Sequence, residues 1–221
     1  MRNDLVRIAG ITCALLAAVL TVLVVRRWDP LISFDDGVAR DLHAHAVTHP
    51  GVTHLARVLS DWVWDPWTMR AMAAAAFLLL LWWRGDRNRA MRVAVAALVA
   101  SVVQQGLKAL VGRERPEWPD PVDSAHFAAY PSGHAMTATV VCGTLLWLLP
   151  EKTPRSKAAA AWTLAVVSVV GVGLTRLYLG VHWFSDVLAG WLLGVALVAL
   201  VTLWRPRSGR PPASPGAPGP A

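Results

Sequence analysis

The feature of this sequence that most restricts its fold is a series of six long apolar runs separated by polar connections. The runs span residues 6–25, 64–83, 92–111, 131–149, 158–174 and 183–204. A helix rises about 1.5 Å per residue, so roughly 20 apolar residues cross the hydrocarbon layer of a bilayer. We therefore expect an all-α, polytopic membrane protein, a bundle of six transmembrane helices with functional motifs in its outer loops.

The composition agrees with a membrane class and argues against a soluble one. Hydrophobic residues make up 55% of the chain and charged residues only 16%, whereas soluble domains average about 25% charged residues. The net charge of +7 would suggest nucleic acid as the partner of a soluble protein. Here the basic residues lie mostly at the ends of apolar runs, where they set membrane topology, so no nucleic acid is expected.

The basic residues also orient the bundle. One side carries twelve of the 21, namely Arg2, Arg7, Arg84, Arg87, Arg89, Arg92, Lys152, Arg155, Lys157, Arg205, Arg207 and Arg210. The bias sharpens when Lys108, Arg115 and Arg176 on the other side are set aside as functional. Because positive loops stay in the cytoplasm, we expect a multi-pass protein of the cell membrane with cytoplasmic termini and an active site at the outer face.

The chain divides into a six-span domain, residues 1–205, and a tail. The tail, residues 206–221, is rich in Pro and Gly and is predicted to be disordered and cytoplasmic. The longest connection, residues 26–63, has apolar residues at helical spacing, which predicts one or two amphipathic helices on the outer membrane surface. Its Asp35-Asp36 and His43-Ala44-His45 segments are discounted as metal ligands because we expect a mobile loop there.

Three polar clusters stand at the outer ends of the runs, within a motif core of residues 108–186. The first is Lys108, near the end of the third run, followed seven residues later by Arg115-Pro116. Pro116 disfavours helix at Arg115, so the chain is expected to leave the helix there. Two cations directed at one point suit a phosphate group, although ordinary loop charges would explain this cluster alone.

The second cluster is Pro131-Ser132-Gly133-His134, which opens the fourth run. The free backbone N–H groups of a helix start can bind an anion, and Gly133 would let it approach the backbone. Ser132 can add a hydroxyl donor, and His134 can give a proton to a leaving oxygen. An N-cap serine beside an interfacial histidine is the simpler alternative.

The third cluster joins the fifth and sixth runs and contains Arg176, His182 and Asp186. The spacing of four predicts that His182 and Asp186 share one face of the sixth helix. An Asp bonded to one imidazole nitrogen fixes the tautomer and leaves the other nitrogen free to attack. A structural His–Asp pair is the alternative, but the three clusters together favour a site.

At these residues the sequence resembles the type 2 phosphatidic acid phosphatase (PAP2) superfamily, in its membrane lipid phosphatase branch. The superfamily pattern, KxxxxxxRP, PSGH and SRxxxxxHxxxD, is matched at every spacing, with Thr175 in place of the Ser that opens the third motif. The resemblance implies phosphate binding by Lys108, Arg115, Ser132, Gly133 and Arg176. It also implies that His182 forms a phosphohistidine, that His134 protonates the leaving oxygen, and that Asp186 orients His182.

The resemblance implies a lipid phosphatase that uses no metal and no cofactor. Its candidate substrates are undecaprenyl diphosphate, phosphatidic acid, phosphatidylglycerol phosphate and diacylglycerol diphosphate. A site at the outer face favours a carrier lipid among them. A vanadate-binding haloperoxidase does not fit a chain made mostly of spans, and a non-catalytic lipid-phosphate transporter would not need both histidines and the aspartate. The oligomeric state stays open.

Overall fold

The computed structural model describes residues 2–204, and the prediction of an all-α fold is confirmed for them. The eight α-helices are α1 (Arg2–Val25), α2 (Asp29–Thr48), α3 (Pro50–Val58), α4 (Pro66–Leu78), α5 (Arg87–Val111), α6 (Gly133–Trp147), α7 (Arg155–Tyr178) and α8 (Phe184–Leu203). Two π-helical turns, η1 (Leu59–Val63) and η2 (Leu79–Trp83), extend α3 and α4. The predicted tail, residues 206–221, lies outside the described residues.

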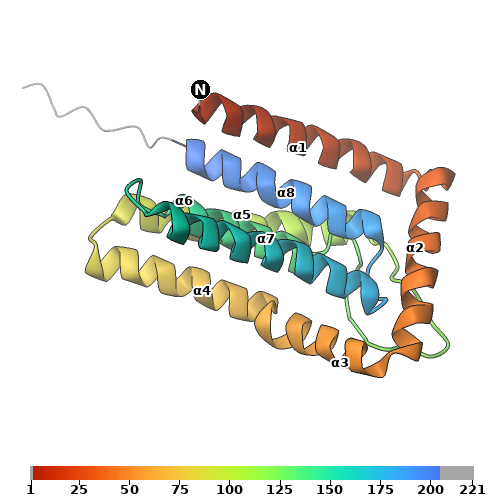
Figure 1. Cartoon of the computed structure of the whole chain (residues 1–221). Coiled ribbons are helices and arrows are strands. Elements are labelled where there is room, and N and C mark those ends of the chain that lie inside the picture. Colours follow the sequence, from red (N-terminus) through yellow and green to blue (C-terminus); the bar gives the residue numbers. More distant parts are fainter. Residues whose placement is uncertain (1, 205–221) are drawn as a thin grey trace, which may run out of the picture.

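Helix α6 is the centre of the bundle. It contacts α4, α5, α7 and α8, while α1 packs on the outer side of α8. Most of its side chains are buried. Helices α1, α4, α5, α6, α7 and α8 run side by side, and α2 crosses the bundle at one end (Figure 1).

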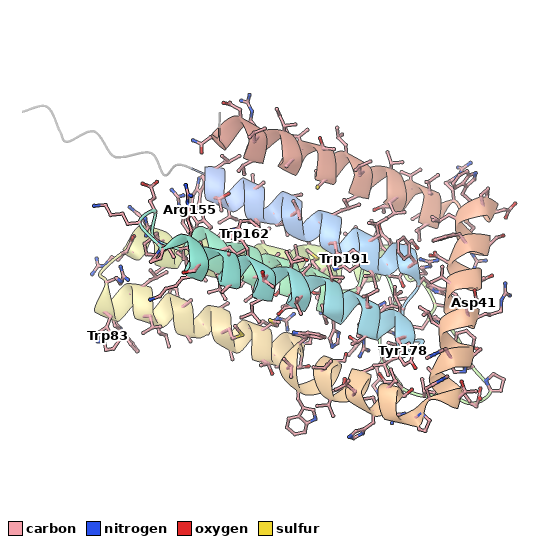
Figure 2. The ribbon with its side chains drawn as sticks, in the orientation of Figure 1. Asp41, Trp83, Arg155, Trp162, Tyr178 and Trp191 are labelled. Carbon is pink, nitrogen blue, oxygen red and sulfur yellow. The ribbon has the colours of Figure 1, made fainter. Side chains whose placement is uncertain are left out.

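Helices α5 and α7 end, and α6 and α8 begin, at the end of the bundle that α2 crosses; we call this the site end. Figure 2 shows Tyr178 and Asp41 at the site end and Trp83 and Arg155 at the opposite end. The N-terminus of α1 also lies at the opposite end (Figure 1). The three polar clusters of the sequence therefore gather at one end of the molecule.

Glycines let α8 approach α6 closely. A Cβ atom at Gly190 would lie 2.8 Å from the carbonyl oxygen of Ser132, and one at Gly194 would lie 2.5 Å from Cβ of Thr139. Small residues at such crossings allow the two backbones to pack against each other. This contact fixes the start of α8 against the start of α6.

Within residues 2–204, four helical segments are long and apolar enough to cross a membrane: Asn3–Val25, Arg87–Val111, Arg155–Tyr178 and Phe184–Leu203. The other two predicted spans form shorter helices, because α4 has 13 residues before η2 and α6 has 15. At about 1.5 Å per residue, α6 is roughly 22 Å long, less than the hydrocarbon thickness of about 30 Å. Its neighbours enclose α6, so its length need not match the lipid.

The outer surface of the bundle is apolar. Exposed large hydrophobic side chains along α1, α5 and α7 include Leu5, Ile8, Leu15, Leu98, Leu164 and Val166. A continuous apolar surface of this extent is unfavourable in water and is typical of a contact with lipid. The surface and the four long helices indicate a membrane protein.

The connection of residues 26–63 is helical, as its spacing predicts, and forms α2, α3 and η1. The expectation of a mobile loop around Asp35 is wrong. Asp35 lies on α2, and its side chain is completely buried. A buried carboxylate needs a partner, and that of Asp35 is paired with an arginine that is described below.

Candidate active site

The centre of the site is a buried contact between His182 and Asp186. The Nδ1 atom of His182 lies 3.3 Å from Oδ2 of Asp186, and the two side chains are 2% and 0% exposed. The prediction that both residues lie on one helix is wrong, because α8 begins at Phe184. Gly180, with φ of 65°, turns the chain between α7 and α8 and leaves His182 in front of the helix.

Asp186 holds the start of α8 as well as the imidazole. Its Oδ2 accepts a hydrogen bond of 2.9 Å from the backbone N–H of Trp183, so it caps the first turn. Its backbone carbonyl accepts a bond of 2.9 Å from the N–H of Ser132. When Nδ1 of His182 carries the proton and donates it to Asp186, Nε2 of the ring presents a lone pair.

Arg115 stands at that second nitrogen of His182. Its Nη1 lies 3.2 Å from Nε2 of His182. Its Nε donates to the carbonyl of Phe127 at 2.9 Å, and Lys108 donates to the carbonyl of Ala128. Helix α5 ends at Val111, so Arg115 lies in the connection beyond the helix, as Pro116 predicts.

The surroundings of His182 favour its neutral form. Burial lowers its pKa well below 6.5, and the positive charges of Arg115, Arg176 and Lys108 lower it further. Burial, together with Arg176, also lowers the pKa of Arg115 to about 10, which leaves its guanidinium charged at neutral pH. A neutral imidazole beside several cations is suited to attack an anion that those cations hold.

The second cluster begins α6. The helix starts at Gly133 with Ser132 as N-cap, and Oγ of Ser132 is buried without a hydrogen-bond partner among the described residues. A Cβ at Gly133 would lie 2.7 Å from Nε2 of Gln104, so this glycine makes room for a buried amide of α5. Sequence reasoning anticipated an anion there and missed Gln104. His134, the second residue of α6, is close enough to His182 for an electrostatic interaction between the two imidazoles.

Arg176, near the end of α7, is buried between two acidic residues. Its Nη1 donates to Oγ of Ser60 at 2.8 Å and lies 3.6 Å from Asp61 and 3.5 Å from Asp123. Its Nε is buried without a hydrogen-bond partner among residues 2–204. The sequence did not single out Asp61 or Asp123, although η1 is a π-helical turn, a feature frequent at functional sites.

Thr175, the departure from the superfamily pattern, keeps its hydroxyl within its own helix. Its Oγ1 donates to the carbonyl of Val172 at 2.9 Å. The hydroxyl therefore stabilises the end of α7, as a serine in the same place could do.

Arg113 is a residue of the site that the sequence analysis did not single out. Its Nη1 lies 2.7 Å from Oδ1 of Asp186, and its Nη2 lies 2.7 Å from Oδ2 of Asp35. The available signal was its position two residues before Arg115 in the first cluster. Its partner Asp35 is too distant in sequence to be found that way.

The structure brings the eight predicted site residues to one end of the bundle, around the imidazole of His182. The arrangement of cations, an unpartnered hydroxyl and a neutral imidazole can hold a phosphate group and attack it. Among residues 2–204, no group of three or more His, Cys, Asp or Glu side chains is placed to hold a metal ion.

The chain is similar to known proteins over most of its length. A sequence model of the PAP2 superfamily matches residues 89–210, more than half of the 221 residues. An undecaprenyl-diphosphatase of Sulfolobus acidocaldarius is 30% identical over 149 residues, which cover 63% of this chain and 62% of the relative. Phosphatidylglycerophosphatase B of Bacillus subtilis is 37% identical over 97 residues, 43% of this chain and 47% of that protein.

A solved structure has the same architecture. The crystal structure of a transmembrane PAP2-type phosphatidylglycerolphosphate phosphatase from Bacillus subtilis superimposes with a TM-score of 0.66 and 25% sequence identity. The match covers 87% of this chain and 93% of that one. The chain thus spans nearly all of this structural neighbour, but only about half to two thirds of the two curated relatives.

Proposed function

Because this chain belongs to the PAP2 superfamily, we propose that it is an integral membrane phosphatase that removes phosphate from a membrane lipid. The observation that carries the proposal is the placement of His182. Its Nδ1 meets the Asp186 carboxylate at 3.3 Å, and its Nε2 meets the Arg115 guanidinium at 3.2 Å. One nitrogen is held for orientation, and the other is directed to the place where cations would bind an anion.

The proposed reaction has two displacements at phosphorus. In the first, Nε2 of His182 attacks phosphorus, the bond to the leaving oxygen breaks, and His134 protonates that oxygen. In the second, His134 takes a proton from water, the water oxygen attacks the phosphohistidine, and the P–N bond breaks to release phosphate. Microscopic reversibility lets one histidine serve first as acid and then as base.

Charge stabilisation in this mechanism comes from the chain itself. Lys108, Arg115 and Arg176 bind the phosphoryl oxygens, helped by the Ser132 hydroxyl and the α6 start at Gly133. Such preorganised donors stabilise the charge that develops on transferring phosphoryl groups. The buried, unpartnered atoms Oγ of Ser132 and Nε of Arg176 support this assignment. Asp186 keeps the proton of His182 on Nδ1.

The substrate class is a lipid phosphomonoester or diphosphate of the undecaprenyl diphosphate or phosphatidic acid type. Two observations support it: the apolar surface around the bundle and the relatives named for undecaprenyl diphosphate and phosphatidylglycerophosphate. In the proposed topology α4 with η2 and α6 complete six spans in a domain of residues 1–205. The end that holds Arg84, Arg89 and Lys152 is cytoplasmic, which puts the site end outside.

The topology can be tested with single cysteines. After replacement of Cys13 and Cys142, Ser124→Cys at the site end and Ser156→Cys at the opposite end are labelled in intact cells. A membrane-impermeant maleimide is expected to label position 124 but not position 156. The reverse pattern would overturn the proposed orientation.

The activity is tested with purified protein and a panel of lipid phosphates in excess chelator. We expect release of inorganic phosphate without added magnesium, and an acid-labile phosphoenzyme in a rapid quench. His182→Asn should abolish both, while Arg89→Gln, at the opposite end of the bundle, should leave both unchanged. Turnover that requires magnesium, or full turnover by His182→Asn, would overturn the mechanism. Lipid binding without phosphate release would point to a transporter instead.

A further inference from the structure

Behind the carboxylate that holds His182 lies a second buried ion pair, which the proposed reaction does not use. It joins Asp35 of α2 to Arg113 of the connection between α5 and α6. Asp35 is 0% exposed and the Arg113 side chain 11% exposed. Buried charges are costly unless they are paired and hydrogen-bonded, so the contacts of this pair indicate what holds it in place.

The guanidinium of Arg113 bridges two carboxylates with different nitrogens. Nη1 donates to Oδ1 of Asp186 at 2.7 Å, and Nη2 donates to Oδ2 of Asp35 at 2.7 Å. Nη1 also donates to Oγ of Ser185 at 2.6 Å. The planar fork of an arginine fixes both directions at once, which a lysine ammonium cannot do. Arg113 thus fixes the oxygen of Asp186 that does not face His182.

Asp35 completes this arrangement from a third element. Its Oδ1 accepts from the backbone N–H of Ser185 at 2.9 Å, and its Oδ2 accepts from the Ser185 hydroxyl as well as from Arg113. The guanidinium also lies over the ring of Trp183, 5.4 Å from its centroid. The residues on both sides of Phe184, the first residue of α8, are therefore held by one network.

The charges explain why a second carboxylate is needed. Arg113 alone would neutralise Asp186, and the carboxylate would then do little to stabilise the positive charge that develops on His182 during attack. With Asp35 as a second anion, the three groups sum to one negative charge, which faces Nδ1 of His182. On its other side the imidazole faces Arg115, Lys108 and Arg176.

We propose that the buried Asp35–Arg113 pair is a positioning device that fixes Asp186 and, through it, the direction of attack by His182. This inference deepens the proposed function and rests on it. It also assigns a role to α2, because this helix brings Asp35, a residue outside the three sequence clusters, into the site.

The test compares Asp35→Asn and Arg113→Gln with Arg89→Gln, a control in which an exposed Arg–Asp pair at the opposite end is lost. Losing a hydrogen bond to a charged group is expected to lower kcat about 10- to 100-fold in the first two variants. The inhibition constant of inorganic phosphate should stay at the wild-type value, because its proposed ligands are untouched. The control should keep the wild-type kcat.

The pH dependence separates positioning from general stability. Asp35→Asn removes a negative charge near His182, which disfavours the protonated form of the imidazole. The acid limb of the pH profile of kcat/KM therefore moves to lower pH. Arg113→Gln removes a positive charge, and the limb moves to higher pH. The other groups that face His182, namely Asp186, Lys108, Arg115, His134 and Arg176, are the same in both variants. A general loss of stability would not shift the two limbs in opposite directions.

Two further measurements complete the design. Arg113→Lys keeps the charge but not the fork, so it should lower kcat while leaving the acid limb in place, and it replaces Arg113→Gln should that variant not fold. The titration of His182, followed by NMR on 15N-histidine protein, should show the same opposite shifts without any turnover. Unchanged kcat, or titrations that coincide in Asp35→Asn and Arg113→Gln, would overturn the positioning role. A wild-type protein without phosphatase activity would instead overturn the proposed function.

Discussion

The approach of α8 to α6 predicts a strong effect from one added methyl group, Gly190→Ala. A Cβ at position 190 would lie 2.8 Å from the Ser132 carbonyl oxygen, 3.0 Å from Cβ of Ala135 and 3.1 Å from the Met136 nitrogen. These atoms are backbone or the first side-chain carbon, so no rotamer change can move them away. Ordinary contact begins near 3.4 Å, so relieving the closest contact requires a separation of about 0.6 Å.

The displacement falls on the site because Gly190 lies one helical turn after Asp186. The 2.9 Å hydrogen bond from Ser132 N–H to the Asp186 carbonyl would lengthen, and His182 would move away from the start of α6. Misplacement of a reacting group by about 1 Å can cost about 100-fold in rate, so we expect kcat to fall roughly tenfold. Overpacking costs about 1–3 kcal/mol, partly offset by about 1 kcal/mol of helix propensity.

The assay is steady-state phosphate release with a thermal unfolding curve, and Gly106→Ala is the matched control. Gly106 lies in α5, a long apolar helix, and a Cβ there meets nothing within 4 Å. We expect the control to keep the wild-type kcat and to unfold at the same or a higher temperature. If Gly190→Ala matched the control in both measurements, the close crossing would not be what positions the site.

Three further predictions follow from individual contacts. Burial and nearby cations lower the pKa of His182, so its neutral form persists below pH 6.5, and the acid limb of the pH profile of kcat/KM should lie below that value. Arg115→Gln removes one of these cations and should move the limb to higher pH. Thr175→Ser should change kcat less than about twofold, because the hydroxyl bonds within α7. Asp123→Asn should tighten inhibition by inorganic phosphate about 2- to 5-fold, because it removes a carboxylate 3.5 Å from Arg176.

The helical fold was accessible from the sequence because apolar runs report directly on length and environment. All six runs are helical, and the chain leaves α5 before Arg115, as Pro116 predicts. The runs could not tell that α6 is only 15 residues long. Its apolar character serves burial among four helices, and hydropathy does not distinguish contact with lipid from contact with protein.

The site was accessible in part, for a similar reason. Short-range spacing was enough to predict the contact of His182 with Asp186 and the helix start at Ser132 and Gly133. His182 was wrongly placed on the sixth helix, because the turn at Gly180 leaves it just before α8, which begins at Phe184. Arg113 was missed, because its partner Asp35 is 78 positions away, and the burial of a charge depends on such a partner.

Arg113 and Arg115 together explain why the first cluster has to leave the helix. They are two residues apart, yet Arg113 reaches the carboxylate at Nδ1 of His182, and Arg115 reaches Nε2. On a continuing α5 the two side chains would point about 200° apart around one axis and could not flank a single ring. Gly112, with φ of 57°, ends α5, and the free segment that follows lets the two arginines pass on either side of His182. The seven residues from Lys108 to Arg115 thus include the end of α5 and the irregular segment that follows it. This segment places the guanidinium of Arg115 at Nε2 of His182, and Arg113 places the bridged carboxylate of Asp186 at Nδ1.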